Sequence, residues 1–291
     1  MGFLLEDMDQ IRIPRFSDDF EAAISESVDR SKRSRLESSV ETAKSTQMLL
    51  TGLGLENWQA PEPRGYTRNH RETFVAGRLD AEFHQPKYAV AFNVVSAKFP
   101  TATLSQLGHV LKGMTVPYYE QGSVPIIRSG DLSDIEDDSR FLTAAENEAI
   151  FELKRGDVLI SSIGFGSIGK VQVFDKPGRF GTVSEVTVIR QSQVNSYYLA
   201  AFLRSKLGQM QIERFITGAT GQLHLYAKAV AQFWVPLLKA DQQLEFEHAA
   251  KASKEAKKRA FYLLEAAKRA VEIAIEDSES AALKYLKSVV K

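Results

Sequence analysis

The 291-residue chain contains no cysteine, which excludes disulfides, zinc–thiolate sites, iron–sulfur clusters and a cysteine nucleophile. It has no excess of charge either, because 37 basic and 37 acidic side chains give a formal net charge of zero. A protein that coats nucleic acid without selectivity would be strongly basic. The charge balance therefore excludes that class and leaves room only for a local DNA-binding face.

Apolar runs long enough to span a membrane, about 18 residues, are also missing from the sequence. The segment Met1–Pro14 lacks the basic-then-apolar pattern of a secretory signal peptide. Hydrophobic residues at 44% and charged residues at 25% are typical of a folded globular chain. We therefore expect a cytoplasmic protein that does not contact a membrane.

Two long segments lack both proline and glycine and repeat apolar residues every three or four positions, which predicts long helices. They are Ser17–Leu50 and Asp241–Glu276, and the second carries an alanine-rich face that needs a close helical neighbour. The first segment offers a matching face of small residues, namely Ser27, Ser31, Ser34 and Ser38. At roughly 50 Å each, both helices are too long to lie wholly on one globular domain. We predict an antiparallel, coiled-coil-like pair, the alternative being two surface helices on a common core.

The region between these helices alternates short β-like runs with turns, which predicts a mixed α+β domain and not a βαβ repeat. The predicted strands are Val124–Arg128, Asp157–Ser161, Lys170–Phe174 and Glu185–Ile189. Ser196–Phe215 has a helical apolar period and is predicted to form one helix. The fold class we expect is therefore α+β, with a mixed domain and two long antiparallel helices.

A weak internal repeat links the two helices. Ile11–Pro14 precedes the first helix after a short gap, and Phe233–Pro236 precedes the second in the same way. Matching units on both sides of one domain are typical of half of a duplicated architecture.

The glycine-rich segment Gly164–Gly169 fits the G-x-G-x-x-G pattern of a dinucleotide site, which requires a helix to follow it. A strand-like run follows instead, so we favour a glycine-rich hairpin. The same segment nearly forms a phosphate-binding P-loop, but Val171 occupies the position where serine or threonine must hold magnesium. ATP binding is therefore rejected.

Other catalytic patterns are faint. Glu152–Lys154 with Asp137 and Asp138 resembles the carboxylate set of a magnesium nuclease. We instead interpret Lys154–Asp157 as a turn before a buried strand and Asp131–Asp138 as a solvated loop. The five histidines are scattered without metal-binding spacing. We expect no catalytic residue, no cofactor and no metal site in this chain.

What remains is recognition, because loops between the predicted strands carry hydroxyl, aromatic, amide and basic groups that can contact bases or phosphates. Glycines in the loop at Ser162 allow the backbone to approach a ligand closely. Taken singly, each of these residues also fits an ordinary turn or surface position. The candidate DNA-binding residues are Arg64, Arg68, Lys112, Thr115, Tyr118, Tyr119, Arg128, Ser162, Phe165, Lys170, Arg179, Thr220, Gln222 and His224.

A run of ordered motifs over nearly the whole chain resembles the DNA specificity (S) subunits of type I restriction–modification systems. Each motif is weak alone, but their order and spacing are specific. The motifs are Arg78–Tyr88, Leu111–Thr115, Val124–Leu132, Leu153–Ser161, Ile168–Val171, Tyr198–Ser205, Gly218–Gln222 and Val235–Leu237. Gln242 and Gln243 stand where the family usually has one glutamine, and Asp18 or Asp19 holds that place before the first helix.

The resemblance implies two target recognition domains that each read half of a split DNA site, held apart by paired helices that dock methyltransferase subunits. Residues 1–53 and 239–291 would then be the helical spacer, and residues 54–238 the recognition domain. With one such domain, the chain is either a half-size subunit that pairs with itself and reads an interrupted palindrome, or a fragment of a longer subunit.

The resemblance also implies partners. These are double-stranded DNA, adenine methyltransferase subunits and restriction subunits, with methyl transfer from S-adenosylmethionine and DNA cleavage left to partner chains. The protein itself would then not be an enzyme. Two alternatives stay open: a magnesium-dependent nuclease or methyltransferase fragment, and a helical scaffold whose globular domain binds protein.

Overall fold

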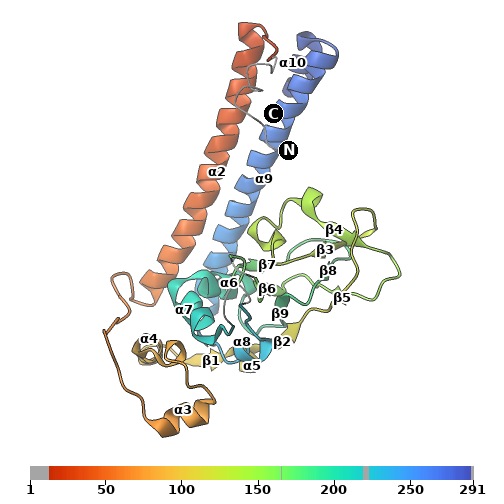
Figure 1. The fold of residues 1–291 in the computed structure, drawn as a ribbon. Helices are drawn as coiled ribbons and strands as arrows, with labels where there is room; N and C mark the ends of the chain where they lie inside the picture. The colour runs from red at the N-terminus through yellow and green to blue at the C-terminus, as the bar shows by residue number, and fades with distance from the viewer. Residues whose placement is uncertain (1–12, 165, 219–222, 290–291) are drawn as a thin grey trace, which may run out of the picture. The chain divides into compact units, whose positions relative to one another are not determined.

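The computed structural model describes residues 13–164, 166–218 and 223–289. The chain divides into two compact units, a helical unit of residues 1–42 and 251–291 and a domain of residues 43–250. Two long helices contribute to both units, α2 (Asp18–Gly52) and α9 (Ala240–Glu276) (Figure 1). Across the described part of the chain, no helix is long and apolar enough to cross a membrane.

In the helical unit, α2 and α9 run antiparallel, as the sequence predicts. Ser27 Oγ donates to the Leu263 carbonyl at 3.0 Å, and Ser31 Oγ donates to the Ala260 carbonyl at 2.7 Å. Ser38 Oγ lies 2.8 Å from Ser253 Oγ, so residue numbers rise along one helix as they fall along the other.

Small side chains form the seam between these helices. The buried residues are Ser27, Ser31, Ser34 and Ser38 on α2 and Ala256, Ala260, Ala267 and Ala270 on α9. Small residues let two helices approach closely, and each serine hydroxyl that bonds across the seam avoids the cost of an unpaired buried group. The apolar period at Leu36 and Val40 does not mark the seam, because these side chains are 65% and 43% exposed.

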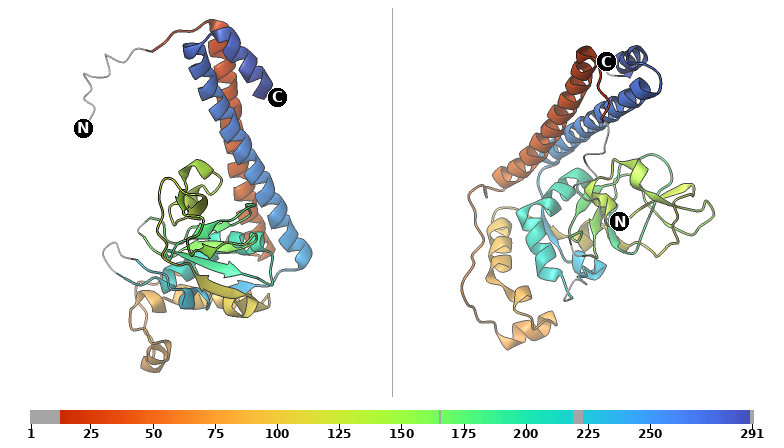
Figure 2. Two further views of the ribbon diagram at one scale, coloured as in Figure 1. Left: turned by 90° about the vertical axis from the view of Figure 1, so that its right-hand side faces the viewer. Right: turned by 45° about the horizontal axis from the view of Figure 1, so that its top comes forward.

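The open end of the pair is closed by an element that the sequence did not predict, helix α10 (Glu279–Val289) (Figure 2). Phe20 is fully buried there in one apolar cluster with Ala270, Ala282 and Leu286. Ser17, directly before α2, accepts the Phe20 N–H through its hydroxyl at 3.4 Å and donates its own N–H to Glu279 at 3.1 Å.

The described residues of the domain form three sheets, and the predicted mixed α+β class is confirmed. The antiparallel sheet has the order β2 (His109–Lys112), β9 (Val186–Arg190), β6 (Val158–Ser161), β7 (Val171–Val173). The mixed sheet has the order β4 (Leu142–Ala144), β3 (Val124–Ile127), β8 (Gly181–Thr182), β5 (Phe151–Glu152), with β3 and β8 parallel. The third pairs β1 (Thr101–Thr103) with β10 (Trp234–Pro236).

The helices of the domain are short. In chain order they are α3 (His70–Ala76), η1 (Glu82–His84), α4 (Pro86–Ser96), α5 (Leu104–Leu107), η2 (Asp131–Ser133), η3 (Asp138–Arg140), α6 (Ser196–Arg204), α7 (Lys206–Phe215) and α8 (Ala227–Val230).

Strand β6 is apolar on both faces because it separates two cores. Val158 and Ile160 pack in the cluster that contains α6 and α7, whereas Leu159 packs in the cluster of the mixed sheet with Ile126 and Phe174. Successive strand residues point to opposite faces, so a continuous apolar run is the expected sequence for such a strand.

The predicted single helix Ser196–Phe215 is wrong, because it breaks at Ser205. Ser205 leaves the helical region, with φ −67° and ψ 166°, and its hydroxyl accepts the Gly208 N–H as the cap of α7. Gly208 permits the tight corner, since a Cβ there would lie 2.4 Å from the Leu203 carbonyl oxygen.

Two loop predictions have different outcomes. The segment Gly164–Gly169 joins the antiparallel strands β6 and β7, so the predicted glycine-rich hairpin is confirmed. The predicted solvated loop Asp131–Asp138 is wrong in part, because Asp131 and Ile135 are each only 4% exposed. Leu132 and Ile135 anchor this segment in the core of the mixed sheet, which a count of its acids does not reveal.

Candidate nucleic-acid interface

Three of the loops singled out in the sequence meet at the turn between β8 and β9. The Glu185 carbonyl accepts the Ser162 N–H at 2.8 Å and the Ser129 hydroxyl at 3.1 Å. Thr115 Oγ1 donates to Ser184 Oγ at 3.4 Å in the same turn. Loops that follow β2, β3 and β6 are thus tied to one point of the chain.

A fourth loop joins this group through the backbone. Gly164 N–H donates to the Leu223 carbonyl at 3.4 Å, and Leu225 N–H donates to the Ser162 carbonyl at 2.8 Å. His224, a predicted site residue, stacks on Tyr226 with ring centroids 5.9 Å apart. Three predicted residues of these loops lie outside the described residues, namely Phe165, Thr220 and Gln222.

Two residues beside His224 were missed in the sequence. Tyr226 is 51% exposed, and Lys228 Nζ lies 6.0 Å from its ring centroid. An exposed ring beside a cation is a surface on which a base can stack while a phosphate is held nearby. The sequence signal that could have predicted Tyr226 and Lys228 as site residues is the alternation of aromatic and basic residues after His224.

The third group surrounds Arg128 and is called the Arg128 pocket. It is an open cavity of about 260 Å³ whose lining includes Tyr118, Arg128, Arg140, Asp131 and Glu185. Arg128 Nε and Nη2 donate to the two carboxylate oxygens of Asp131 at 3.1 and 3.2 Å. Sequence reasoning missed Asp131 because it placed the acids of this segment in solvent, and it did not consider Arg140 or Glu185 as site residues.

Of the other candidate residues, some contact protein side chains and others are exposed. Lys170 Nζ donates to Ser133 Oγ at 2.7 Å, and Arg179 lies 3.3 Å from a Glu146 carboxylate oxygen and 3.9 Å from one of Glu152. Lys112 is exposed at the end of β2 and forms no ion pair with another described residue. Tyr119, 55% exposed, forms a backbone bridge with Thr143 at the edge of the mixed sheet.

Arg64 and Arg68 belong to a different part of the domain. Arg68 Nε donates to the His84 carbonyl at 3.0 Å, and its Nη1 lies 3.8 Å from Glu72. In both Figures 1 and 2, helix α3 lies apart from β3 and β4. Helix α3, which Arg68 shortly precedes, therefore lies away from the mixed sheet that carries Arg128.

Near α3, Arg214 and Arg78 both pack on Phe83. Their guanidinium carbons lie 4.5 and 4.9 Å from the Phe83 ring centroid. Burial lowers the pKa of the Arg214 guanidinium, whereas the hydrogen bond to Asp80 raises the pKa of Arg78. Both side chains are therefore held in place by protein contacts.

Two carboxylates of the nuclease-like pattern face a cation. Asp138 accepts from Lys176 Nζ at 2.5 Å, and Glu152 lies beside Arg179. Among the residues that the structure describes, no group of three histidine, aspartate or glutamate side chains is placed to hold a metal ion.

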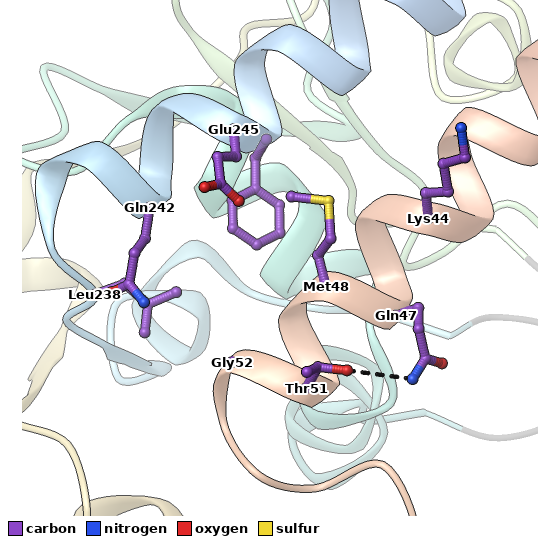
Figure 3. A pocket seen from close by; sticks show the side chains of 9 residues that line it. Lys44, Gln47, Met48, Thr51, Gly52, Leu238, Gln242 and Glu245 are labelled. Carbon is purple, nitrogen blue, oxygen red and sulfur yellow. Dashed lines mark hydrogen bonds between the residues drawn. The ribbon is translucent and has the colours of Figure 1, made fainter.

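A separate cavity of about 460 Å³ lies in the domain where α2 ends and α9 begins (Figure 3). Met48, Leu238 and Phe246 give it apolar walls, and Gln47 Nε2 donates to Thr51 Oγ1 at 3.3 Å on its rim. Its polar groups do not pair a nucleophile with a base, so it presents no catalytic arrangement.

The part of the chain that contains these loops matches a known protein family. A model described as the type I restriction modification DNA specificity domain matches residues 98–247, a range that includes all the converging loops. Arg64 and Arg68 lie outside that range. A search of curated proteins finds no match.

Two solved structures are similar to the chain. The S subunit of a type I restriction–modification system from M. genitalium is 14% identical, with a TM-score of 0.47 over 92% of this chain and 57% of that chain. A structure reported for complex assembly and conformational transition of the type I R-M system is 13% identical, with a TM-score of 0.41 over 92% of this chain and 59% of that one. The chain thus spans less than two thirds of either.

Proposed function

Because the chain belongs to the type I restriction modification DNA specificity domain family, we propose that it selects the DNA sequence on which a type I restriction–modification complex acts. In this role it directs methyltransferase and endonuclease partners to a bipartite site. The observation that carries the proposal is the convergence of four loops, with their hydroxyl, aromatic and basic groups, inside the matched range.

The proposal divides the contacts with DNA by chemistry. Exposed Lys112 is suited to phosphates, which fix register and orientation without reading sequence. Thr115, Tyr118, Arg128 and His224 supply donors, acceptors and rings that distinguish base edges. A net charge of zero suits a subunit whose partners share the phosphate contacts.

A bipartite site needs two recognition domains, and the described chain contains one. We propose residues 54–238 as this domain, with residues 1–53 and 239–291 as a helical spacer that also docks the methyltransferase. The second domain comes either from a second copy of the chain or from further residues of a longer one. Light-scattering mass of the purified protein, alone and with its methyltransferase, separates these two arrangements.

In this proposal the partner chains catalyse both DNA methylation and DNA cleavage. Adenine methylation would use S-adenosylmethionine bound by the methyltransferase, and cleavage would occur in the restriction subunit. The purified chain incubated with DNA and either Mg²⁺ or the methyl donor should show no turnover. Turnover that follows this chain through purification and disappears with its variants would overturn that assignment in favour of a catalytic fragment.

The central test is selection from a random double-stranded DNA library by the reconstituted complex with its methyltransferase. We expect enrichment of an interrupted site, which is a palindrome if two copies of the chain pair by twofold symmetry. A complex that assembles normally and enriches no sequence would instead support a scaffold that binds protein.

A further inference from the structure

Arg128 is held in one orientation by a buried carboxylate. The Asp131 side chain is 3% exposed, whereas that of Arg128 is 34% exposed. Asp131 also accepts the Arg128 backbone N–H at 2.9 Å, so the same carboxylate fixes both the backbone and the side chain of the arginine. Fixing a long side chain in advance removes much of the entropy cost of forming a new contact.

The remaining donors of Arg128 point to a ligand with two neighbouring acceptors. Asp131 uses Nε and one N–H of Nη2, which leaves Nη1 and the second N–H of Nη2 on the outer edge of the planar guanidinium. Two parallel N–H groups at this spacing match either the O6 and N7 atoms of guanine or two phosphate oxygens.

The charge of the Arg128 pocket favours the base over the phosphate. Its two arginines, Arg128 and Arg140, are matched by two carboxylates, Asp131 and Glu185. A guanidinium whose charge is compensated attracts a phosphate weakly, but its N–H donors keep their direction. A neutral base edge with two acceptors therefore gains more from this group than an anion does.

The surroundings fit a flat ligand. Tyr118 is 42% exposed, and the Arg128 guanidinium carbon lies over its ring, 5.8 Å from the ring centroid, so an exposed aromatic face adjoins the guanidinium. Ser129 is anchored through its hydroxyl to the Glu185 carbonyl, which holds the far side of the pocket in place.

We propose that Arg128 reads one guanine of the recognition site through the outer edge of its guanidinium, and that Asp131 is the residue that positions it. This inference rests on the proposed function, since it requires DNA to be the ligand of these loops. It goes further by naming the base, the residue that reads it and the residue that orients the reader.

The test compares library selection by the assembled complex carrying wild-type chain, Arg128→Lys or Asp131→Asn. Lysine keeps the charge but cannot make two parallel hydrogen bonds, and asparagine keeps the size but loses the second charged acceptor. We expect both variants to lose the preference for guanine at the same single position, by about tenfold or more, while the other positions keep theirs. Thermal unfolding of each variant is measured in parallel, and Arg128→Lys, which leaves Asp131 in place, keeps the test valid if Asp131→Asn does not fold.

The matched control is Arg155→Lys, since Arg155 also contacts a carboxylate, Asp175 at 2.7 Å, but lies outside the Arg128 pocket. This control should leave every position of the selected site unchanged. Uniform weakening on all sequences by Arg128→Lys, with no loss of preference at any single position, would overturn guanine reading in favour of a phosphate contact. Unchanged selection would assign Arg128 and Asp131 to folding alone, and a wild-type complex that selects no sequence would refute the proposed function itself.

Discussion

Single residues fix the geometry of this domain through buried polar contacts. Asp157, 1% exposed, accepts two hydrogen bonds from Arg190, at 2.9 and 2.6 Å, and a third from the Lys154 N–H at 2.8 Å. The hydrogen bonds to Asp157 raise the pKa of Arg190. The ion pair joins the turn before β6 to the end of β9.

We expect Asp157→Asn to lower the free energy of unfolding by about 3 kcal/mol, because it leaves the charge of Arg190, whose side chain is only 16% exposed, without its counter-ion. Chemical denaturation measures the loss. Arg155→Gln removes a pair in which the arginine side chain is 69% exposed, and should change stability little. Equal effects of the two substitutions would show that the Asp157 pair is no stronger than an exposed one.

The two adjacent glutamines at the start of α9 have different roles. Gln243, 9% exposed, accepts the Asn195 N–H at 2.7 Å and donates to the Leu238 carbonyl at 2.8 Å. Gln242, which is partly exposed, accepts the Lys239 N–H at 3.2 Å. The buried residue of the pair is therefore the one that ties α9 to α6.

Replacing Gln243 with alanine should cost about 1–3 kcal/mol, since it leaves the Asn195 N–H and the Leu238 carbonyl unpaired in the interior. Gln242→Ala is the matched control, and its thermal unfolding should resemble that of the unmodified protein. A larger loss for Gln242→Ala than for Gln243→Ala would contradict this assignment.

At the scale of elements, the α2–α9 seam depends on side-chain size. Ser31 is 3% exposed and faces the Ala260 carbonyl, so the two helix backbones come close at this level. Larger residues at such positions force closely packed helices apart.

We therefore expect Ser31→Leu to destabilise the helical unit by about 1–3 kcal/mol through overpacking. Ser39→Leu makes the same chemical change on an exposed position of α2 and serves as the control. Circular dichroism during heating follows both variants. If Ser31→Leu melts at or above the temperature of Ser39→Leu, the seam is not closely packed in solution.

At the scale of the whole molecule, the proposed function makes the helices a spacer between two recognition domains. A helix rises about 1.5 Å per residue, and one helical turn of DNA, about 10 base pairs, spans about 34 Å. Seven residues inserted at matching levels of α2 and α9 would thus add roughly 10 Å.

Such a double insertion should lengthen the non-specific spacer of the selected DNA site by about three base pairs, with both half-sites unchanged. Library selection with the reconstituted complex gives the spacer directly. The same seven residues inserted beside Gly65, in the loop before α3, should leave the spacer as it was. An unaltered spacer in the double-insertion complex would mean that the helices do not set the separation.

Regular patterns in the sequence were enough to predict the α+β class, the long helices and the main strands. Apolar residues at every second position of a strand, or at every third or fourth position of a helix, indicate which face of the element is buried. The small serine residues on one face of α2 indicated that a second helix packs there. Helix α10 was missed because its short apolar period follows directly on that of α9, with only the turn at Asp277 and Ser278 between them.

The candidate site was predictable only as a list of residue types in loops. The sequence placed Arg128 among the candidates, but Asp131 was assigned to solvent and Tyr226 was not considered. Loop contacts such as those of the Glu185 carbonyl join residues far apart in the chain, and no local period records them.

The sequence by itself thus determined the α+β class, the two long helices and the main strands, and it excluded cysteine chemistry, since these follow from local periodicity and composition. Only the tertiary structure decided which loops meet and which charges are compensated, because both depend on long-range packing. The sequence alone gives no basis for distinguishing Arg128 from Arg179. One is oriented by a buried aspartate at an open pocket, and the other lies between two surface glutamates.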